Sequence, residues 1–78
     1  VELHIRGMRV EEALIQVEEF LDKAIHDGMS SVRIVHGKGT GAPRQAVREL
    51  LTDHPLARSH ATEARERGGE GVTVVELV

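Results

Sequence analysis

With 78 residues, 29% of them charged, and a formal net charge of −3, the chain is long enough for one small domain and is not basic overall. The absence of cysteine excludes disulfides and cysteine-based zinc sites, and a single aromatic residue argues against stacking nucleic-acid bases on aromatic side chains. No apolar run is long enough to span a membrane, so we expect no membrane partner and a cytoplasmic location.

The first half of the chain has the pattern of a strand, a helix and a second strand. Apolar and polar side chains alternate over residues 1–5, which predicts a half-buried strand. An apolar stripe at helical spacing predicts a helix from Val10 to Asp27, with Gly28 as its C-terminal cap. Ser31 to His36 carries apolar residues on both faces, which is typical of an interior strand. We therefore expect the two strands to be parallel, with a right-handed crossover.

The second half continues with a helix and two strands. Pro43 suits the first turn of a helix that ends before Pro55. We predict a weak strand around Ser59–Thr62, a polar, glycine-rich connection from Arg65 to Gly71, and a final strand over Val72–Leu77. The order β-α-β-α-β-β predicts an α/β fold: a two-layer α/β sandwich of a four-stranded mixed sheet with both helices on one face.

The loop after the second predicted strand is the strongest candidate site. Its glycines let the backbone approach a ligand closely, and the N-terminus of the following helix favours an anion. Lys38 and Arg44 add positive charge for phosphate oxygens, and His36 can exchange a proton near neutral pH. Phosphodiester cleavage needs both properties. The loop reads His36, Gly37, Lys38, Gly39, Thr40 and Gly41.

A simpler interpretation of this loop is equally good on spacing alone. Its glycines then serve only a tight turn between a strand and a helix. The spacing matches neither a Walker loop nor a Rossmann fingerprint, so we expect no bound nucleotide. Charge distribution favours the phosphate site, because no acidic residue occurs from Ser30 to Arg48. The basic residues of that segment are Arg33, Lys38, Arg44 and Arg48.

The first strand offers a second cluster of candidate side chains. Glu2, His4 and Arg6 alternate with Leu3 and Ile5 and so share one face. Since the carboxyl ends of parallel strands meet at one edge of a sheet, the end of this strand is expected to come close to the glycine loop. Pattern alone favours the alternative that these polar residues form the solvated face of an open sheet.

Three stretches together resemble the Smr (small MutS-related) domain, in the version found at the C-terminus of the second bacterial MutS paralogue, the anti-recombination type. The resemblance covers essentially the whole chain, and the second stretch is the most specific. Residues 1–78 are therefore expected to be one Smr domain excised from a longer protein. The stretches are Glu2 to Gly7, His36 to Gly41, and Gly68 to Leu77.

The resemblance implies a two-layer α/β fold similar to the C-terminal domain of bacterial translation initiation factor three. It implies an endonuclease that nicks branched or duplex DNA without sequence preference, with some members acting on RNA. The implied parent is a dimeric ATPase that suppresses homologous recombination or rescues collided ribosomes, so the implied partners are DNA and ribosomal RNA. Magnesium or manganese are candidate cofactors, but the resemblance does not settle the metal.

The chain departs from the family in its first motif, which usually places Asp between two leucines. Leu3, Arg6 and Gly7 match that motif, but His4 occupies the Asp position. Two hypotheses remain open. In the first, the domain is a nuclease in which His36 is the acid or base, basic residues hold the phosphate, and Glu2 or His4 transfers a second proton or binds a metal. In the second, loss of the Asp leaves a nucleic-acid-binding module; a protein-interaction domain ranks below both.

Overall fold

The computed structural model describes residues 1–39 and 41–78. The predicted order of elements is confirmed, and two short 3₁₀ turns lie between the last two strands. The elements are β1 (Glu2–His4), α1 (Val10–His26), β2 (Ser31–Val35), α2 (Ala42–Leu51), β3 (Ala57–Thr62), η1 (Arg65–Arg67), η2 (Gly69–Gly71) and β4 (Val72–Leu77).

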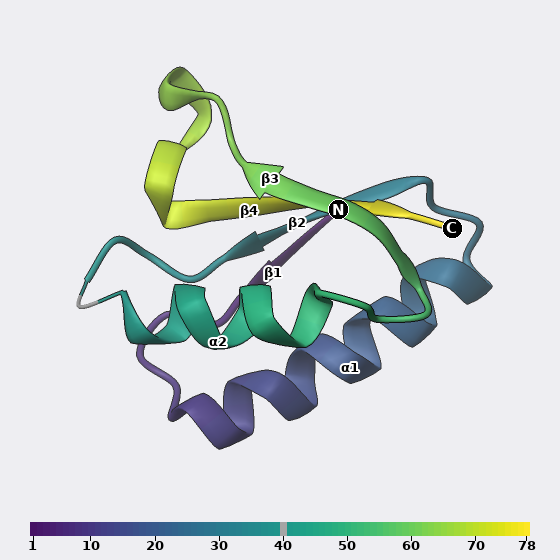
Figure 1. Cartoon of the computed structure of the whole chain (residues 1–78), viewed down its shortest axis with the longest axis horizontal. Coiled ribbons are helices and arrows are strands. Elements are labelled where there is room, and N and C mark those ends of the chain that lie inside the picture. The colour runs from purple at the N-terminus through teal and green to yellow at the C-terminus, as the bar shows by residue number, and fades with distance from the viewer. Residues whose placement is uncertain (40) are drawn as a thin grey trace.

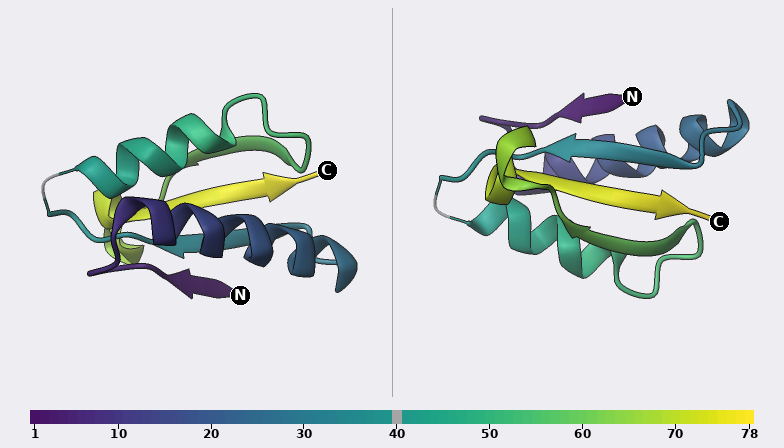
Figure 2. Two further views of the ribbon diagram at one scale, coloured as in Figure 1. Left: turned by 90° about the horizontal axis from the view of Figure 1, so that it is seen from below. Right: turned by 90° about the horizontal axis from the view of Figure 1, so that it is seen from above.

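The four strands form one mixed sheet in the order β1-β2-β4-β3 (Figure 2). β1 and β2 are parallel, as predicted, and β4 is antiparallel to both of its neighbours. Both helices cover the same face of the sheet, so the predicted two-layer sandwich is confirmed (Figure 1). Neither helix in the described part of the chain is long and apolar enough to cross a membrane.

The core between the two layers is aliphatic, as the near absence of aromatic residues predicts. The central strands β2 and β4 direct alternate side chains toward the helices, and burying each of these branched side chains contributes roughly 1.5–3 kcal/mol. The fully buried residues of this core, 0–4% exposed, are Ile5, Ala13, Val17, Leu21, Ala24, Val32, Ile34, Val47, Leu51, Val75 and Leu77.

The end of α1 shows why its predicted boundary was one residue too late. Asp27 is the C-cap, and Gly28 follows in the left-handed conformation (φ 77°). Gly28 N–H donates to the Ile25 carbonyl (3.0 Å) and Met29 N–H to the Ala24 carbonyl (2.9 Å). These paired bonds satisfy the last carbonyls of the helix, which is why glycine stands directly after the cap.

The C-terminal half differs from the prediction in two details. β3 begins two residues earlier than the predicted Ser59, with an irregularity in its pairing to β4 between Ala57 and Ser59. The polar connection to β4 is folded into the turns η1 and η2. Gly68 joins these turns at φ 122°, and a Cβ there would lie only 2.6 Å from Cγ2 of Val72. Glycine is therefore required at this position by both conformation and space.

Candidate functional site

The candidate site residues divide between the two faces of the sheet. His36 continues the alternation of Val32 and Ile34 and lies on the helix side, where it is 4% exposed. His4 pairs in register with Val35 and therefore faces the open side of the sheet. The structure thus brings the end of β1 to the glycine loop, as expected, but does not bring Glu2 and His4 together with His36.

His36 uses both of its ring nitrogens within the protein. Its Nδ1–H donates to the Gly37 carbonyl (3.0 Å), and its Nε2 accepts a hydrogen bond from the Thr73 hydroxyl (2.8 Å). Burial lowers the pKa of His36 below its ordinary value, and the positive charges of Arg48 and Arg44 lower it further. The neutral ring therefore fixes the first peptide of the glycine loop, and neither nitrogen is left over for a ligand.

Burial of His36 predicts a pH-dependent stability. The unfolded chain takes up a proton at His36 near pH 6.5, whereas the folded chain does so only at lower pH, so acidification favours unfolding. We expect the free energy of unfolding, measured by urea titration, to fall between about pH 7.5 and pH 5.5. A His36→Gln variant should lose most of this dependence. Equal slopes in the native and variant domains would contradict the prediction.

A glycine-walled hollow of about 390 Å³ lies on the open face at the carboxyl ends of β1 and β2. Val35 and Val72 line it from the sheet, and Arg6 and Lys38 contribute its charged side chains. The stem of Arg6 packs over Gly37, where a Cβ would lie 3.3 Å from both Cγ and Nε of Arg6. The φ of 81° at Gly37 also favours glycine. The glycines lining the hollow are Gly37, Gly39, Gly68 and Gly71.

The hollow presents hydrogen-bond donors and positive charge. Arg6 and Lys38 form no ion pair or side-chain hydrogen bond with any residue in the described ranges. The backbone N–H groups of Lys38 and Gly39 likewise find no acceptor there. Behind them α2 begins without an acidic residue in its first turn or a side-chain cap. Such a set of donors at a helix N-terminus suits an anion.

The other predicted cations are engaged within the protein. Arg33 forms ion pairs with Glu2 and with Glu63, the latter at 3.0 Å between Nε and Oε2. Arg44 pairs with Glu70 at 3.2 Å between Nη1 and Oε1, and Arg48 donates a hydrogen bond to the Thr62 hydroxyl. Of the remaining loop residues, Gly41 is the N-cap of α2 at φ 88°, and Thr40 lies outside the described residues.

Glu2 and His4 form a pair beside the hollow. His4 Nε2–H donates to Oε1 of Glu2 (3.0 Å), while Arg33 binds the second carboxylate oxygen. The hydrogen bond from His4 lowers the pKa of Glu2, and the charge of Arg33 lowers it further. His4 Nδ1 has no partner in the described part of the chain, and the side chain is 65% exposed. Because His4 pairs in register with Val35, which lines the hollow, the two residues are neighbours on the same face of the sheet.

The described residues contain no group of three or more histidine or acidic side chains placed to hold a metal ion. Glu2 and His4 offer two potential ligands only. The described residues therefore do not make a complete metal site.

Sequence reasoning missed the contribution of the Gly68–Gly71 stretch to the site. The sequence predicts only a polar, glycine-rich connection here, yet Gly68 and Gly71 form one wall of the hollow. Gly71 also accepts hydrogen bonds from the backbone N–H groups of His36 and Gly37, each at 3.0 Å. The available signal was the density of glycines directly before a β-branched strand.

The fold and the hollow define a small two-layer α/β domain with a glycine-walled, basic hollow at the carboxyl ends of its parallel strands. The chain belongs to the Smr domain family, whose model matches residues 3–78. Its structure resembles the Smr domain of Thermus thermophilus MutS2, with a TM-score of 0.97 and 47% identity, covering 99% of this chain and 96% of that one. It also resembles YdaL, a stand-alone small MutS-related protein from Escherichia coli, with a TM-score of 0.91 and 30% identity, covering 97% of this chain and 63% of that one.

Longer proteins contain a segment about as similar to this chain in sequence as the Thermus thermophilus domain is. The chain is 51% identical over 76 residues to a Thermomicrobium roseum protein named "Endonuclease MutS2", covering 97% of this chain and 10% of that protein. It is 49% identical over 77 residues to the "Putative endonuclease MutS2" of Bacillus subtilis, covering 99% of this chain and 10% of that protein. The chain thus spans about a tenth of the length of the curated relatives it matches.

Proposed function

We propose that the domain is an endonuclease module that cuts the nucleic-acid backbone, nicking branched or duplex DNA without sequence preference. The observation that carries this proposal is the glycine-walled hollow, in which Arg6 and Lys38 have no ion pair within the described residues, with the Glu2–His4 pair on the same face of the sheet. The names of the MutS2 relatives support the reaction class. Contacts to phosphate carry no sequence information, which accounts for cleavage without a preferred sequence.

The two basic side chains of the hollow and the Glu2–His4 pair have different roles in this proposal. Arg6 and Lys38 bind the non-bridging oxygens of the phosphate and stabilise the negative charge that develops as water attacks phosphorus. His4, oriented by Glu2, accepts the proton of that water through the unpartnered Nδ1. A new bond forms between the water oxygen and phosphorus, the bond to the leaving sugar oxygen breaks, and that oxygen takes a proton from solvent.

His36 has a different role in this account from the acid or base first expected. Its two ring nitrogens hold Gly37 and Thr73, so His36 positions the loop that carries Lys38. Its direct participation in proton transfer stays a prediction that this geometry does not favour. Because His4 is exposed and His36 is buried, His4 is the better placed of the two histidines to meet a substrate.

A supercoiled-plasmid assay tests the proposed function. The purified domain is incubated with plasmid in magnesium, in manganese and in chelator, and the conversion to open circles is followed on gels. We expect nicks at many sites in at least one condition. An intact plasmid under every condition, together with retained DNA binding, would contradict the nuclease and favour the alternative.

That alternative is a binding module for branched DNA or ribosomal RNA. The presence of His4 in place of the family Asp favours it, because a missing carboxylate removes a general base or metal ligand. Whether the domain cuts or only binds, we propose that it belongs to a longer parent ATPase that is a homodimer. This parent would use the domain in suppressing homologous recombination or in ribosome rescue. Magnesium or manganese remain candidates whose effect the plasmid assay measures.

A further inference from the structure

A second hollow, of about 340 Å³, adjoins the first and shares Lys38 with it. It lies between Lys38 and the η1–η2 turn, and Arg65 and Gly69 line its other side. The two hollows therefore place three basic side chains in a series, from Arg6 through Lys38 to Arg65. The glycine loop and the η1–η2 turns, which carry Lys38 and Arg65, lie at the same end of the sheet (Figure 1).

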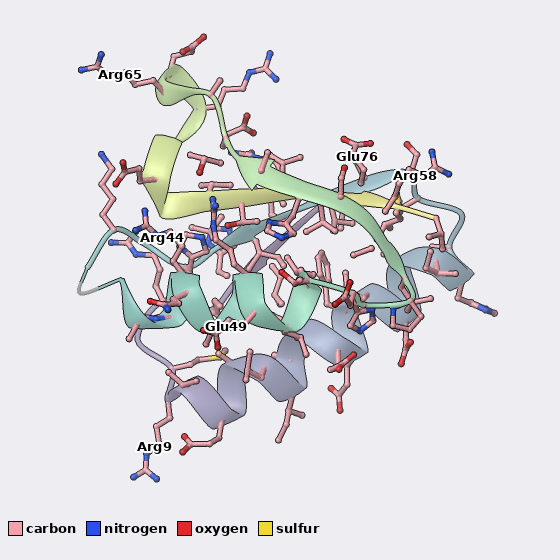
Figure 3. The ribbon with its side chains drawn as sticks, in the orientation of Figure 1. Arg9, Arg44, Glu49, Arg58, Arg65 and Glu76 are labelled. Carbon is pink, nitrogen blue, oxygen red and sulfur yellow. The ribbon has the colours of Figure 1, made fainter. Side chains whose placement is uncertain are left out.

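The charge that the second hollow offers to a ligand depends on which of its charged side chains already form ion pairs. Glu63 and Glu70 line it, but Glu63 is paired with Arg33 at 3.0 Å and Glu70 with Arg44 at 3.2 Å. Arg65 is exposed and has no ion pair within residues 1–39 and 41–78, and it projects from the tip of the turn (Figure 3). The acids of this hollow are therefore compensated, whereas its arginine is available.

The turn that carries Arg65 is braced on several sides. The N–H groups of Arg67 and Gly69 both donate to the Ala64 carbonyl, at 2.9 and 3.0 Å. Arg33, reaching up from β2, donates through Nη2 to the Arg67 carbonyl (2.6 Å). A braced backbone lowers the entropy lost when a ligand is bound, so the position of Arg65 suits binding.

We propose that the second hollow is a subsite for the phosphate next to the scissile one on the same nucleic-acid strand, with Arg65 as its principal contact. Lys38 stands between the two phosphates and Arg6 lies at the far end of the path. The proposal rests on the proposed function of the first hollow. Glu66 opposes this binding, because it is an exposed carboxylate next to Arg65 without an ion pair in the described part of the chain.

Fluorescence anisotropy of a labelled DNA duplex, titrated at several salt concentrations, tests this subsite. Arg65→Gln is expected to weaken binding by about fivefold or more at low salt and to reduce the slope of log affinity against log salt by about 0.9. Arg58→Gln is the matched control, because Arg58 is also exposed and unpaired in the described residues but lies at the other end of the sheet (Figure 3). Glu66→Gln is expected to tighten binding.

The outcomes separate this inference from the proposed function. A change in affinity and slope for Arg65→Gln, with none for Arg58→Gln, supports the subsite. Equal effects of the two substitutions, or no effect of either, would overturn the subsite. If a Lys38→Gln variant still weakens binding in that case, the proposed function is unaffected. If neither the native domain nor any variant binds DNA or an RNA duplex, both the subsite and the proposed function fail.

Discussion

An Arg6→Gln, Lys38→Gln double variant is expected to nick plasmid DNA at least about a hundredfold more slowly than the native domain at saturating DNA. Each hydrogen bond to a charged group contributes roughly 1.5–3 kcal/mol, so losing two such contacts in the transition state gives this factor or more. Arg6 and Lys38 are exposed and without ion pairs in the described ranges, so their replacement should leave folding intact. Single-turnover nicking, followed on gels, measures the effect.

The control for this variant removes two positive charges from residues that do not line the hollow. Arg9 and Arg58 are also exposed and unpaired within the described residues, and neither of them lines the hollow. An Arg9→Gln, Arg58→Gln variant should therefore keep the native rate at saturating DNA. If the two double variants slow nicking equally, general electrostatic attraction is sufficient and the hollow has no special role.

A His36→Ala variant is expected to lose a large part of the stability of the domain. The substitution removes a buried ring, opens a cavity, and leaves the fully buried Thr73 hydroxyl without its partner. Together these changes cost roughly 2–4 kcal/mol. In a domain of this size each kcal/mol lowers Tm by about 4–8 °C, so a large shift is expected by differential scanning calorimetry.

Two further variants check this interpretation of His36. Thr73→Val keeps the shape of the core but leaves the ring nitrogen without its hydrogen bond, and should cost about 1–2 kcal/mol. His26→Ala, at an exposed position in the last turn of α1, should change stability by less than about 0.5 kcal/mol. A native Tm for His36→Ala would contradict the structural role, and would return this histidine to the list of catalytic candidates.

The fold could be predicted from the sequence because local patterns and the global arrangement agree. The apolar stripe of α1, the glycine after its cap and the apolar run of β2 each specify one element and one layer. A strand, a helix and a strand in that order leave little choice except a parallel pair. The errors fall at element ends, as at Ala57, where an irregularity in strand pairing extends β3 beyond its sequence pattern.

The site was only partly predictable, because charge compensation depends on residues distant in the sequence. The segment from Ser30 to Arg48 contains no acidic residue, yet in the fold Glu63 comes to Arg33 and Glu70 comes to Arg44. Sequence proximity therefore overestimated the free positive charge of this segment. Arg65 was missed for the converse reason, because it belongs to a connection that only the fold brings beside Lys38.

The alternation of residues along the sequence already indicates which face of the sheet the His36 side chain occupies. Val32, Ile34 and His36 alternate along β2, and this alternation already places the ring on the buried face. The motif nevertheless suggested catalysis, since histidine beside glycines and lysine is a common arrangement for phosphate chemistry. The same alternation places Glu2 and His4 on the open face, where the hollow lies.

Nicking by a His4→Ala variant at saturating DNA, compared with the native domain, tests the central claim most directly. The side chain of His4 is 65% exposed and hydrogen-bonds only to Glu2 in the described residues, so the variant should fold and bind DNA normally. The single-turnover rate is expected to fall about a hundredfold or more while binding is unchanged, since a general base contributes roughly 10²–10⁴-fold. A native nicking rate in this variant would contradict the assignment of the Glu2–His4 pair as the proton acceptor.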